Sequence, residues 1–411
     1  MWPPPYIRPR SLLMPMKSTM KTCLATVMSA AAVFCLAIDA AACTAVLVGK
    51  DASTTGRVIL GHNEDDDPSL VVRHGYVPPR EWPADALLVD HPDCAKIPRG
   101  PRSLGFFWTE VRDAKCGAGS AVSFVNEKGV AIVSDNAGPT KENSPDADVL
   151  TDGGIWFALR LAVAERAKSA REAVEIIGAL VEKWGYRPSG RTYTVADAEE
   201  GWMVQVVRGR HWVAMRCPDD AIAVMPNHYT IHAIPESPTK DCLFSHDVVA
   251  YAVGKGWWPK EREFDFALAY QDPKWVKIPH NTRRQQYVTS LLLGKEWTDE
   301  SYPFSVKAAR RVSPDDVRAA LSAHPESGGW LRHASDFDET PSACRRQTIE
   351  SLVVAFGETP ADCVAQISGN RPCEKGYRTF KPLVHPLPRE FDDGDAAGRL
   401  ERFFLPEPAL R

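Results

Sequence analysis

The sequence predicts an α+β fold in which helices pack on antiparallel β-sheets. Three observations lead to this expectation. Short β-rich runs come in neighbouring pairs, two helical segments follow them, and a further series of β-rich runs comes after the helices. Strands and helices do not alternate one for one, as they do around a parallel sheet. The sequence also has no glycine-rich phosphate-binding loop.

The bulk composition is that of an ordinary globular protein. The chain has 411 residues, of which 44% are hydrophobic and 25% are charged, so it is long enough to bury a large core. Its formal net charge is −4 at pH 7. This mildly acidic balance argues against nucleic acid or an anionic membrane surface as a partner.

The first 42 residues have the pattern of an export signal. Lys17 and Lys21 precede the uncharged stretch Leu24–Ile38, which has the length of a signal-peptide core and is too short to cross a bilayer. Ala40–Ala42 then supplies the small side chains that signal peptidase requires before its cleavage site. We therefore predict that residues 1–42 are a signal peptide that is removed.

Removal of that leader makes Cys43 the first residue of the mature chain. We expect residues 43–411 to form a single domain that is exported to the periplasm or secreted. No later segment is long and apolar enough to cross a membrane, so we expect no membrane contact once the leader is gone.

Two hairpins are expected near the start of this domain. Thr44–Gly49 and Arg57–Gly61 are β-rich runs separated by a polar turn. Ala121–Val125 and Val130–Ser134 flank a turn that contains a glycine, which predicts a second hairpin. The segment between the hairpins, Asp66–Lys115, is rich in Pro, Asp and Arg, and we expect it to form long loops.

Two helices are expected after the second hairpin. Gly153–Lys168 is apolar on nearly all sides, which predicts a well-buried helix. The next helix begins at a predicted capping box formed by Ser169 and Glu172, and it ends at Gly185. Its apolar face is predicted to comprise Val174, Ile177, Val181 and Trp184.

The chain after these helices predicts a four-stranded antiparallel meander, because four β-rich runs are joined by short turns. These runs are Thr192–Ala196, Trp202–Val207, His211–Met215 and Ala221–Met225. From Asp241 onward the pattern becomes mixed and mostly helical.

Eight of the ten cysteines lie after the leader. An oxidising compartment permits disulfides among them. The pairs that are close in sequence are Cys94 with Cys116, Cys217 with Cys242, and Cys363 with Cys373.

Cys43 is the strongest candidate for a catalytic residue. A cysteine thiol is the most nucleophilic common side chain near neutral pH. If Cys43 is also the first residue, its α-amino group lies within reach as a base, and such a group has a pKa of about 7.7–8. One residue would then supply both nucleophile and base. Two other roles stay open for this cysteine, a lipid anchor and a core or disulfide position, although Thr44–Gly49 continues at once as a strand rather than as a polar tether.

The run "HNEDDD" (His62–Asp67) follows the second predicted strand. The expected hairpin returns this run beside Cys43, where a carboxylate could hold the new α-ammonium group. A solvated acidic loop and a metal site are the alternatives. The sequence lacks calcium-loop spacing, HExxH and paired CxxC motifs, so we expect neither a metal nor a cofactor.

Two asparagines close predicted strands, Asn227 in "MPNHYTI" and Asn136 in "SDNAG". Asparagine at the end of a strand is commonly a turn residue. In an active site, its side-chain N–H groups could instead stabilise an oxyanion.

Several ordered blocks together resemble a known family. The sequence around Cys43, "GHNEDD", "VNEKGVAIVSDNAG", "SGRTYTVADAEEGWMVQVVRGRHWVAMR" and "PNHYTI" is similar to the cysteine dipeptidases of the Ntn-hydrolase superfamily, the dipeptidase A type related to secernins. The resemblance runs from Cys43 nearly to the C-terminus. It implies a four-layer αββα sandwich with two antiparallel sheets, and hydrolysis of dipeptide amide bonds by an N-terminal cysteine through a thioester, without a cofactor.

More distantly, the chain resembles penicillin V acylases and bile-salt hydrolases, and this resemblance implies roles for five further residues. Asp65 matches the carboxylate that contacts the α-amine, and Asn227 matches the oxyanion-hole asparagine. His62 stands where those relatives have an arginine, and Asn136 matches the second oxyanion position. Arg346 is the candidate for a distal catalytic arginine. We assign His62, Asn136 and Arg346 to substrate binding.

The expected partner is therefore a small peptide substrate, a dipeptide, and a homo-oligomer stays open. Two alternative functions stay open as well. The first is an N-acyl amide hydrolase that uses the same site, and the second is a lipid-anchored binding protein without enzymatic activity.

Overall fold

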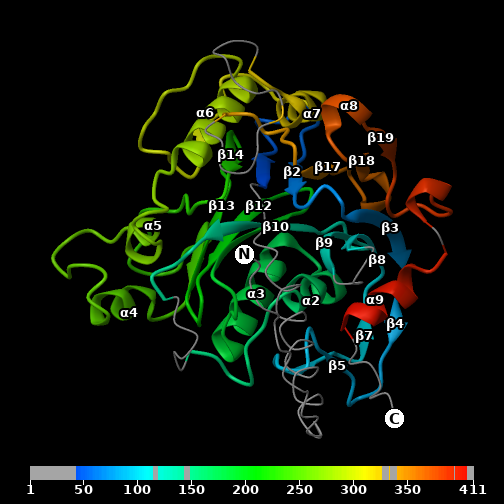
Figure 1. The fold of residues 1–411 in the computed structure, drawn as a ribbon, viewed down its shortest axis with the longest axis horizontal. Coiled ribbons are helices and arrows are strands. Elements are labelled where there is room, and N and C mark those ends of the chain that lie inside the picture. Colours follow the sequence, from blue (N-terminus) through cyan, green and yellow to red (C-terminus); the bar gives the residue numbers. More distant parts are fainter. Residues whose placement is uncertain are drawn as a thin grey trace, which may run out of the picture. The chain divides into compact units, whose positions relative to one another are not determined.

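The strand that follows Cys43 lies inside the first of two large antiparallel sheets (Figure 1). The computed structural model describes residues 43–113, 119–142, 149–325, 333, 340–392 and 394–404, so the predicted leader and Cys116 lie outside the described residues. In spatial order, the strands of the first sheet are β16 (Val306–Lys307), β14 (Ala221–Met225), β1 (Thr44–Val48), β2 (Ile59–Asp65), β17 (Thr348–Ala355), β18 (Val364–Gly369) and β19 (Arg378–Phe380).

The second sheet takes its strands from the middle of the chain. In spatial order, they are β15 (Cys242–Phe244), β13 (Trp212–Arg216), β12 (Gly201–Val206), β11 (Gly190–Ala196), β10 (Ala131–Gly138), β9 (Gly119–Asn126), β8 (Phe106–Arg112) and β3 (Val71–Val77). Two short pairs complete the strands, β4 (Arg80–Glu81) with β7 (Arg102–Ser103) and β5 (Leu87–Leu88) with β6 (Ile97–Pro98).

Helices cover the outer face of each sheet. Helices α2 (Ala158–Arg166) and α3 (Ala170–Trp184) pack on the second sheet, and α6 (Pro279–Leu293) and α7 (Pro314–Ser322) pack on the first. The remaining helices are α4 (Val248–Gly254), α5 (Phe266–Tyr270), α8 (Pro372–Lys375) and α9 (Ala396–Phe404), with 3-10 turns η1 (Pro360–Asp362) and η2 (Arg389–Phe391).

Strand β1 shows why the layers stack in this order. Successive side chains of a strand point to opposite faces of its sheet. Ala45 and Leu47 lie in the apolar core between the two sheets, whereas Val46 and Val48 lie in the core under α6 and α7. A third core joins the second sheet to α2 and α3. The expected αββα arrangement with two antiparallel sheets is therefore confirmed.

The predicted hairpins and the start and end of helix α3 are confirmed, while the predicted capping box forms only in part. Strands β1 and β2 form the expected hairpin, and β9 and β10 form the second one. Helix α3 begins at Ser169, whose hydroxyl accepts a hydrogen bond from the backbone N–H of Glu172. The Glu172 carboxylate accepts from the N–H of Lys168 rather than from that of Ser169, so only half of the predicted box forms. Gly185 ends the helix with φ of 78°.

Three predictions of secondary structure need correction. The predicted meander loses its last strand, because β14 leaves β13 and pairs with β1 in the other sheet. The segment predicted as long loops contains the strands β3 and β8. In β8, buried Glu110 pairs with Arg399 of α9 and interrupts the apolar pattern by which a strand is predicted. The chain after Asp241 contains the expected helices but also β17 and β18, which pair inside the first sheet.

Two of the predicted disulfides join cysteines that the structure describes, and neither is formed. Cys217, Cys242 and Cys363 are free buried thiols. Cys373 lies beside Cys344 instead, with a distance of 3.5 Å between the two Sγ atoms. Sequence proximity therefore did not identify the neighbouring cysteines.

Gly61 of β2 gives a stability test of the packing between the first sheet and α7. A Cβ atom at Gly61 would lie 2.5 Å from Cγ1 of Val317. We expect Gly61→Ala to lower the free energy of unfolding in urea by about 1–3 kcal/mol, because the helix must move away.

Gly369 of β18 is the matched control for this substitution. A Cβ atom there meets no other atom within 4 Å. Gly369→Ala should leave the unfolding free energy unchanged or raise it by less than about 1 kcal/mol. Equal urea midpoints for the two variants would contradict the described packing of α7.

Candidate active site

Cys43 lies immediately before β1, at the level where its two neighbouring strands end. Thr44 of β1 pairs with Asn63 of β2, so Cys43, one residue earlier, lies opposite Glu64. Strand β14 ends at Met225, opposite Ala45, and Asn227 follows two residues later. The pairing of β1 along both edges therefore brings the segments that carry Glu64 and Asn227 toward the start of β1.

Acidic groups surround the Cys43 thiol. The backbone N–H of Asp65 donates to Sγ over 3.5 Å, and Oε1 of Glu64 lies 3.9 Å from Sγ. Burial raises the pKa of the Cys43 thiol well above its usual range, and the charges of Glu64, Asp135 and Asp65 raise it further. The thiol therefore stays protonated at neutral pH and needs a base before it can act as a nucleophile.

His62 is a poor candidate for that base. Its Nε2 atom lies 3.4 Å from Oδ1 of Asp135, and both side chains are buried. Burial lowers the pKa of His62, but the charge and hydrogen bond of Asp135 outweigh this effect, so the pKa is raised overall. A charged imidazole has no lone pair with which to accept the proton of Cys43.

Two carboxyl groups close to Cys43, those of Glu64 and Asp65, act electrostatically on its thiol. Burial raises the pKa of Glu64 to about 7, and its Oε2 atom makes no hydrogen bond to the described residues. The Oδ1 atom of Asp65 accepts a hydrogen bond from the Thr348 hydroxyl at 2.6 Å. Buried acidic groups of this kind are stabilised when a positive charge lies next to them.

Hydrogen bonds with four neighbouring residues hold Asn227, one of them from the Trp275 indole N–H to its backbone carbonyl at 2.7 Å. Its Nδ2 atom donates to the backbone carbonyl of Asn136 at 2.7 Å, and its Oδ1 atom accepts from Arg284 at 2.6 Å. Asn281 donates to the backbone carbonyl of Asn227 at 2.9 Å. One of the two N–H bonds on Nδ2 is engaged by Asn136, and the other can serve a substrate.

Asn136 lies at an irregularity of β10, where the pairing with β11 shifts before Gly138. Its Oδ1 atom accepts from the backbone N–H of Gly138 at 2.9 Å. Gly138 has φ of 78°, and the Trp275 indole occupies the space that a Cβ atom would need, so only glycine fits. The backbone carbonyl of Asn136 therefore lies next to the side chain of Asn227, at the irregular end of β10.

Arg346 does not join this group, because its side chain is exposed. Its neighbour Arg345 and Arg284 of α6 are fully buried instead. Burial and the charge of Arg345 lower the pKa of Arg284 to about 9, while the charges of Asp65 and Cys43 act in the opposite direction. Arg284, like the buried Arg191, lies near Cys43, so Arg284 replaces the exposed Arg346 as the candidate arginine.

The sequence held a signal for Arg284 that was missed. Besides Thr282 and Thr289, helix α6 buries four polar side chains at spacings of one, three and four residues. Polar residues at helical spacing that face inward indicate a functional surface rather than a solvated one. These residues are His280, Asn281, Arg284 and Gln285.

Comparison with known proteins identifies the family. A family model described as peptidase family C69 matches residues 42–376. The chain belongs to peptidase family C69. A protein named "Probable dipeptidase" from Latilactobacillus sakei is 25% identical over 339 residues, which cover 82% of this chain and 70% of the relative. "Probable dipeptidase B" from Lactococcus lactis is 28% identical over 294 residues, which cover 69% of this chain and 61% of the relative.

These matches confirm the resemblance to cysteine dipeptidases that the sequence motifs predicted. Among solved structures, the chain is similar to a conjugated bile acid hydrolase from Clostridium perfringens. That similarity has a TM-score of 0.42 and a sequence identity of 12%, and it covers 83% of this chain and 92% of the other.

Cys43, His62 and Glu64 also form a set of possible metal ligands. Each offers a ligand atom within 4.8 Å of the others. Coordination of the thiol would remove the nucleophile that a cysteine peptidase requires, so the two roles exclude each other. Family membership favours the nucleophile.

The His62–Asp135 pair predicts a pH dependence of stability. The pKa of His62 is raised in the folded state, so the pair stabilises the fold fully below the unfolded pKa of about 6.5, and this contribution is lost as pH rises through the higher folded pKa. We expect His62→Gln to lower the free energy of unfolding by about 3–5 kcal/mol at pH 5.5, and by less at pH 8.5.

The control for this measurement is His246→Gln, because His246 is exposed. That change should alter the urea midpoint little at either pH. An equal loss of stability at both pH values for His62→Gln would contradict the charged pair.

The reassigned arginine can be tested by a matched pair of substitutions. Arg284→Met removes the partner of Asn227, and we expect it to lower kcat/KM by about 100-fold, the usual cost of losing one group that stabilises developing charge. Arg346→Met should stay within about twofold of the unchanged enzyme, since its side chain is exposed. A large loss in Arg346→Met with none in Arg284→Met would restore the original assignment.

Proposed function

We propose that the protein is an exported dipeptidase in which Cys43 is the nucleophile and its own α-amino group, freed by removal of residues 1–42, is the base. The names of the two relatives support a dipeptide substrate. The observation that carries the mechanism is the group of three carboxylates, Glu64, Asp65 and Asp135, around a buried thiol. Such a group disfavours a thiolate and favours an ammonium ion at the same place.

Cleavage of the leader supplies that ammonium ion. Before cleavage, the nitrogen of Cys43 belongs to an amide bond and has no basic lone pair. After cleavage, it is an amine with a pKa of about 7.7–8 before the surrounding charges act on it. It can then take the Sγ proton while Asp65 and Glu64 stabilise the resulting positive charge.

The reaction proceeds through two acyl-transfer steps. Sγ attacks the scissile carbonyl carbon, and the carbonyl oxygen becomes an oxyanion that accepts a hydrogen bond from Asn227. Arg284 fixes Asn227 and balances the negative charge. The ammonium group gives its proton to the leaving amine as the C–N bond breaks, which leaves a thioester on Cys43.

Water completes the cycle. The free α-amine takes a proton from a water molecule, which attacks the thioester carbonyl and releases the carboxylic acid product as the C–S bond breaks. His62 and Asn136 lie beside this centre and are assigned to substrate binding. This sequence of steps uses only groups of the chain itself and one water molecule.

The proposed site of action is the periplasm or the medium, after export by the leader. In the residues that the structure describes, no helix has the length and hydropathy needed to cross a membrane.

The maturation step gives the decisive test. Two forms of the chain are compared, one that begins at Cys43 and one that keeps Ala42 in front of it. We expect the extended form to lose at least about 100-fold in kcat/KM for dipeptides, because general-base catalysis of this kind contributes about 10²–10⁴-fold. Cys43→Ala should abolish hydrolysis, and Cys43→Ser should retain at most weak activity.

The same assay distinguishes the rival functions when N-acyl amides, including penicillin V, are tested beside dipeptides. Turnover of acyl amides alone would replace the dipeptidase by an acylase. Full activity of the extended form would remove the α-amine from the role of base. A diacylglyceryl group on Cys43, detected by intact mass, would favour the lipid-anchored binding protein.

A further inference from the structure

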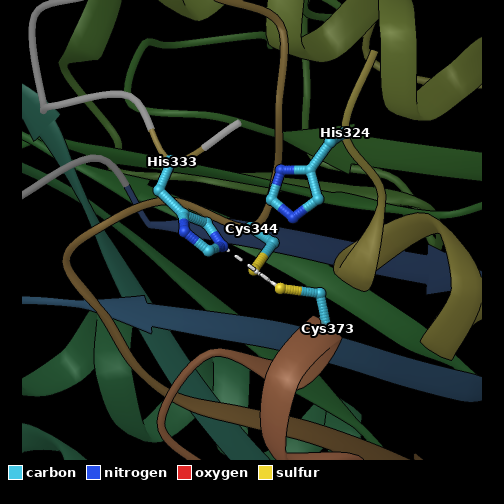
Figure 2. Close-up of side chains that lie close together, drawn as sticks. All are labelled: His324, His333, Cys344 and Cys373. Carbon is cyan, nitrogen blue, oxygen red and sulfur yellow. Dashed lines mark hydrogen bonds between the residues drawn. The ribbon is translucent and has the colours of Figure 1, made fainter. Parts of the chain in front are cut away.

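Two histidines and two cysteines converge at a second place in the fold, outside the group around Cys43 (Figure 2). His324 follows the end of α7, Cys344 lies in the loop before β17, and Cys373 belongs to α8. His333 approaches from the chain between α7 and β17. Each of the four residues offers a ligand atom, and these atoms all lie within 4.8 Å of one another.

The spacing of these atoms is that of ligands around a shared centre. Zinc lies about 2.3 Å from sulfur and about 2.0–2.1 Å from imidazole nitrogen, so a tetrahedral site separates two sulfurs by about 3.7 Å and a sulfur from a nitrogen by about 3.6 Å. The Sγ atoms of Cys344 and Cys373 are 3.5 Å apart. The Nε2 atom of His333 is 3.2 Å from Sγ of Cys373.

These distances do not describe a disulfide, whose sulfurs are about 2.05 Å apart. The rings of His324 and His333 meet edge to face, with their centroids 4.9 Å apart. In Figure 2 both rings lie on the same side of the two sulfur atoms, so the four side chains face a common point.

The surroundings of His333 add a second, independent feature of metal sites. While Nε2 of His333 faces Cys373, its Nδ1 atom lies 3.6 Å from Oε1 of Glu374. Glu374 is itself held by Arg371, whose NH2 group lies 2.8 Å from Oε2. Histidine ligands of zinc commonly direct their other ring nitrogen at a carboxylate, which fixes the tautomer and the orientation of the ring.

We propose that His324, His333, Cys344 and Cys373 form a structural zinc site. Four protein ligands complete a tetrahedron and leave no position for a substrate, which is the arrangement of structural rather than catalytic zinc. Each cysteine binds as a thiolate, so binding of one zinc ion releases two thiol protons at neutral pH. The charges of the ion and of the two thiolates then cancel, which suits a partly buried position.

The loop that carries Cys344 connects this site to the catalytic strands. The carbonyl of Ala343 accepts a hydrogen bond from Asn63 of β2 at 3.0 Å. Thr348, at the other end of the loop, donates to the Asp65 carboxylate at 2.6 Å. Zinc would therefore fix the loop that positions Asp65, and it would link α7 and α8 to the same sheet.

Metal analysis of the purified chain tests this proposal. We expect about one zinc ion per chain by elemental mass spectrometry, and a loss of at least tenfold in Cys344→Ser and Cys373→Ser. Cys217→Ser is the matched control, since Cys217 is a buried free thiol elsewhere in the fold. Cys43→Ala is the second control, and it should keep its zinc, which would separate this site from the group around the nucleophile.

Cobalt exchange gives a readout that needs no substitution. Co²⁺ in place of zinc should produce thiolate-to-cobalt charge-transfer absorption and the intense visible bands of a tetrahedral ion. A cobalt complex without the sulfur bands would overturn the proposal even if the serine variants fail to fold. A zinc content below about a tenth of an ion per chain, after growth with added zinc, would also overturn the proposal. A peptide map in which Cys344 and Cys373 form a disulfide would replace the zinc site by a covalent link.

Discussion

The active centre depends on the pairing of β1 along both of its edges. Strand β1 is hydrogen-bonded to β2 on one side and to β14 on the other, and its two faces are buried in different cores. A shift of one residue would exchange the two faces of the strand, so the register is strongly fixed. That register brings Glu64 of β2 and the chain that follows β14 toward the start of β1, where Cys43 lies.

Around this fixed point the protein gathers buried groups of both charges, and His62, Arg160 and Arg191 act on the same Glu64 carboxyl group. Carboxylates gather where an α-ammonium group would lie, and Arg284 stands behind Asn227, where negative charge would develop on a substrate. The two sets come from different parts of the chain, the first from the paired strands and the second from α6. Because the whole centre is buried, these charges act on each other with little screening by water.

The sequence was informative wherever the signal is local. Cys43, His62, Asp65 and Asn227 were singled out because the sequence places them at the ends of predicted strands, although His62 lies inside β2. The capped helix α3 was predicted from its periodicity. Long-range strand pairing could not be predicted, since the apolar pattern of a buried strand does not indicate which strand it pairs with. For that reason β14 was placed in the wrong sheet, and the neighbour of Cys373 was missed. Arg284 was missed because its helix turns polar residues inward, against the usual pattern of a surface helix.

The position of β17 has a consequence for how the chain reaches its active form. Strand β17 pairs with β2, so Leu60 faces Val354 from almost the other end of the chain. Contacts of such high sequence separation form late, because a long loop must close before they are gained. Until β17 has been synthesised and docked, β2 presents an unpaired edge, which is prone to wrong pairing. A nascent or truncated chain therefore holds Cys43 in an unfinished sheet, and assembly of the group around this cysteine is among the last events of folding.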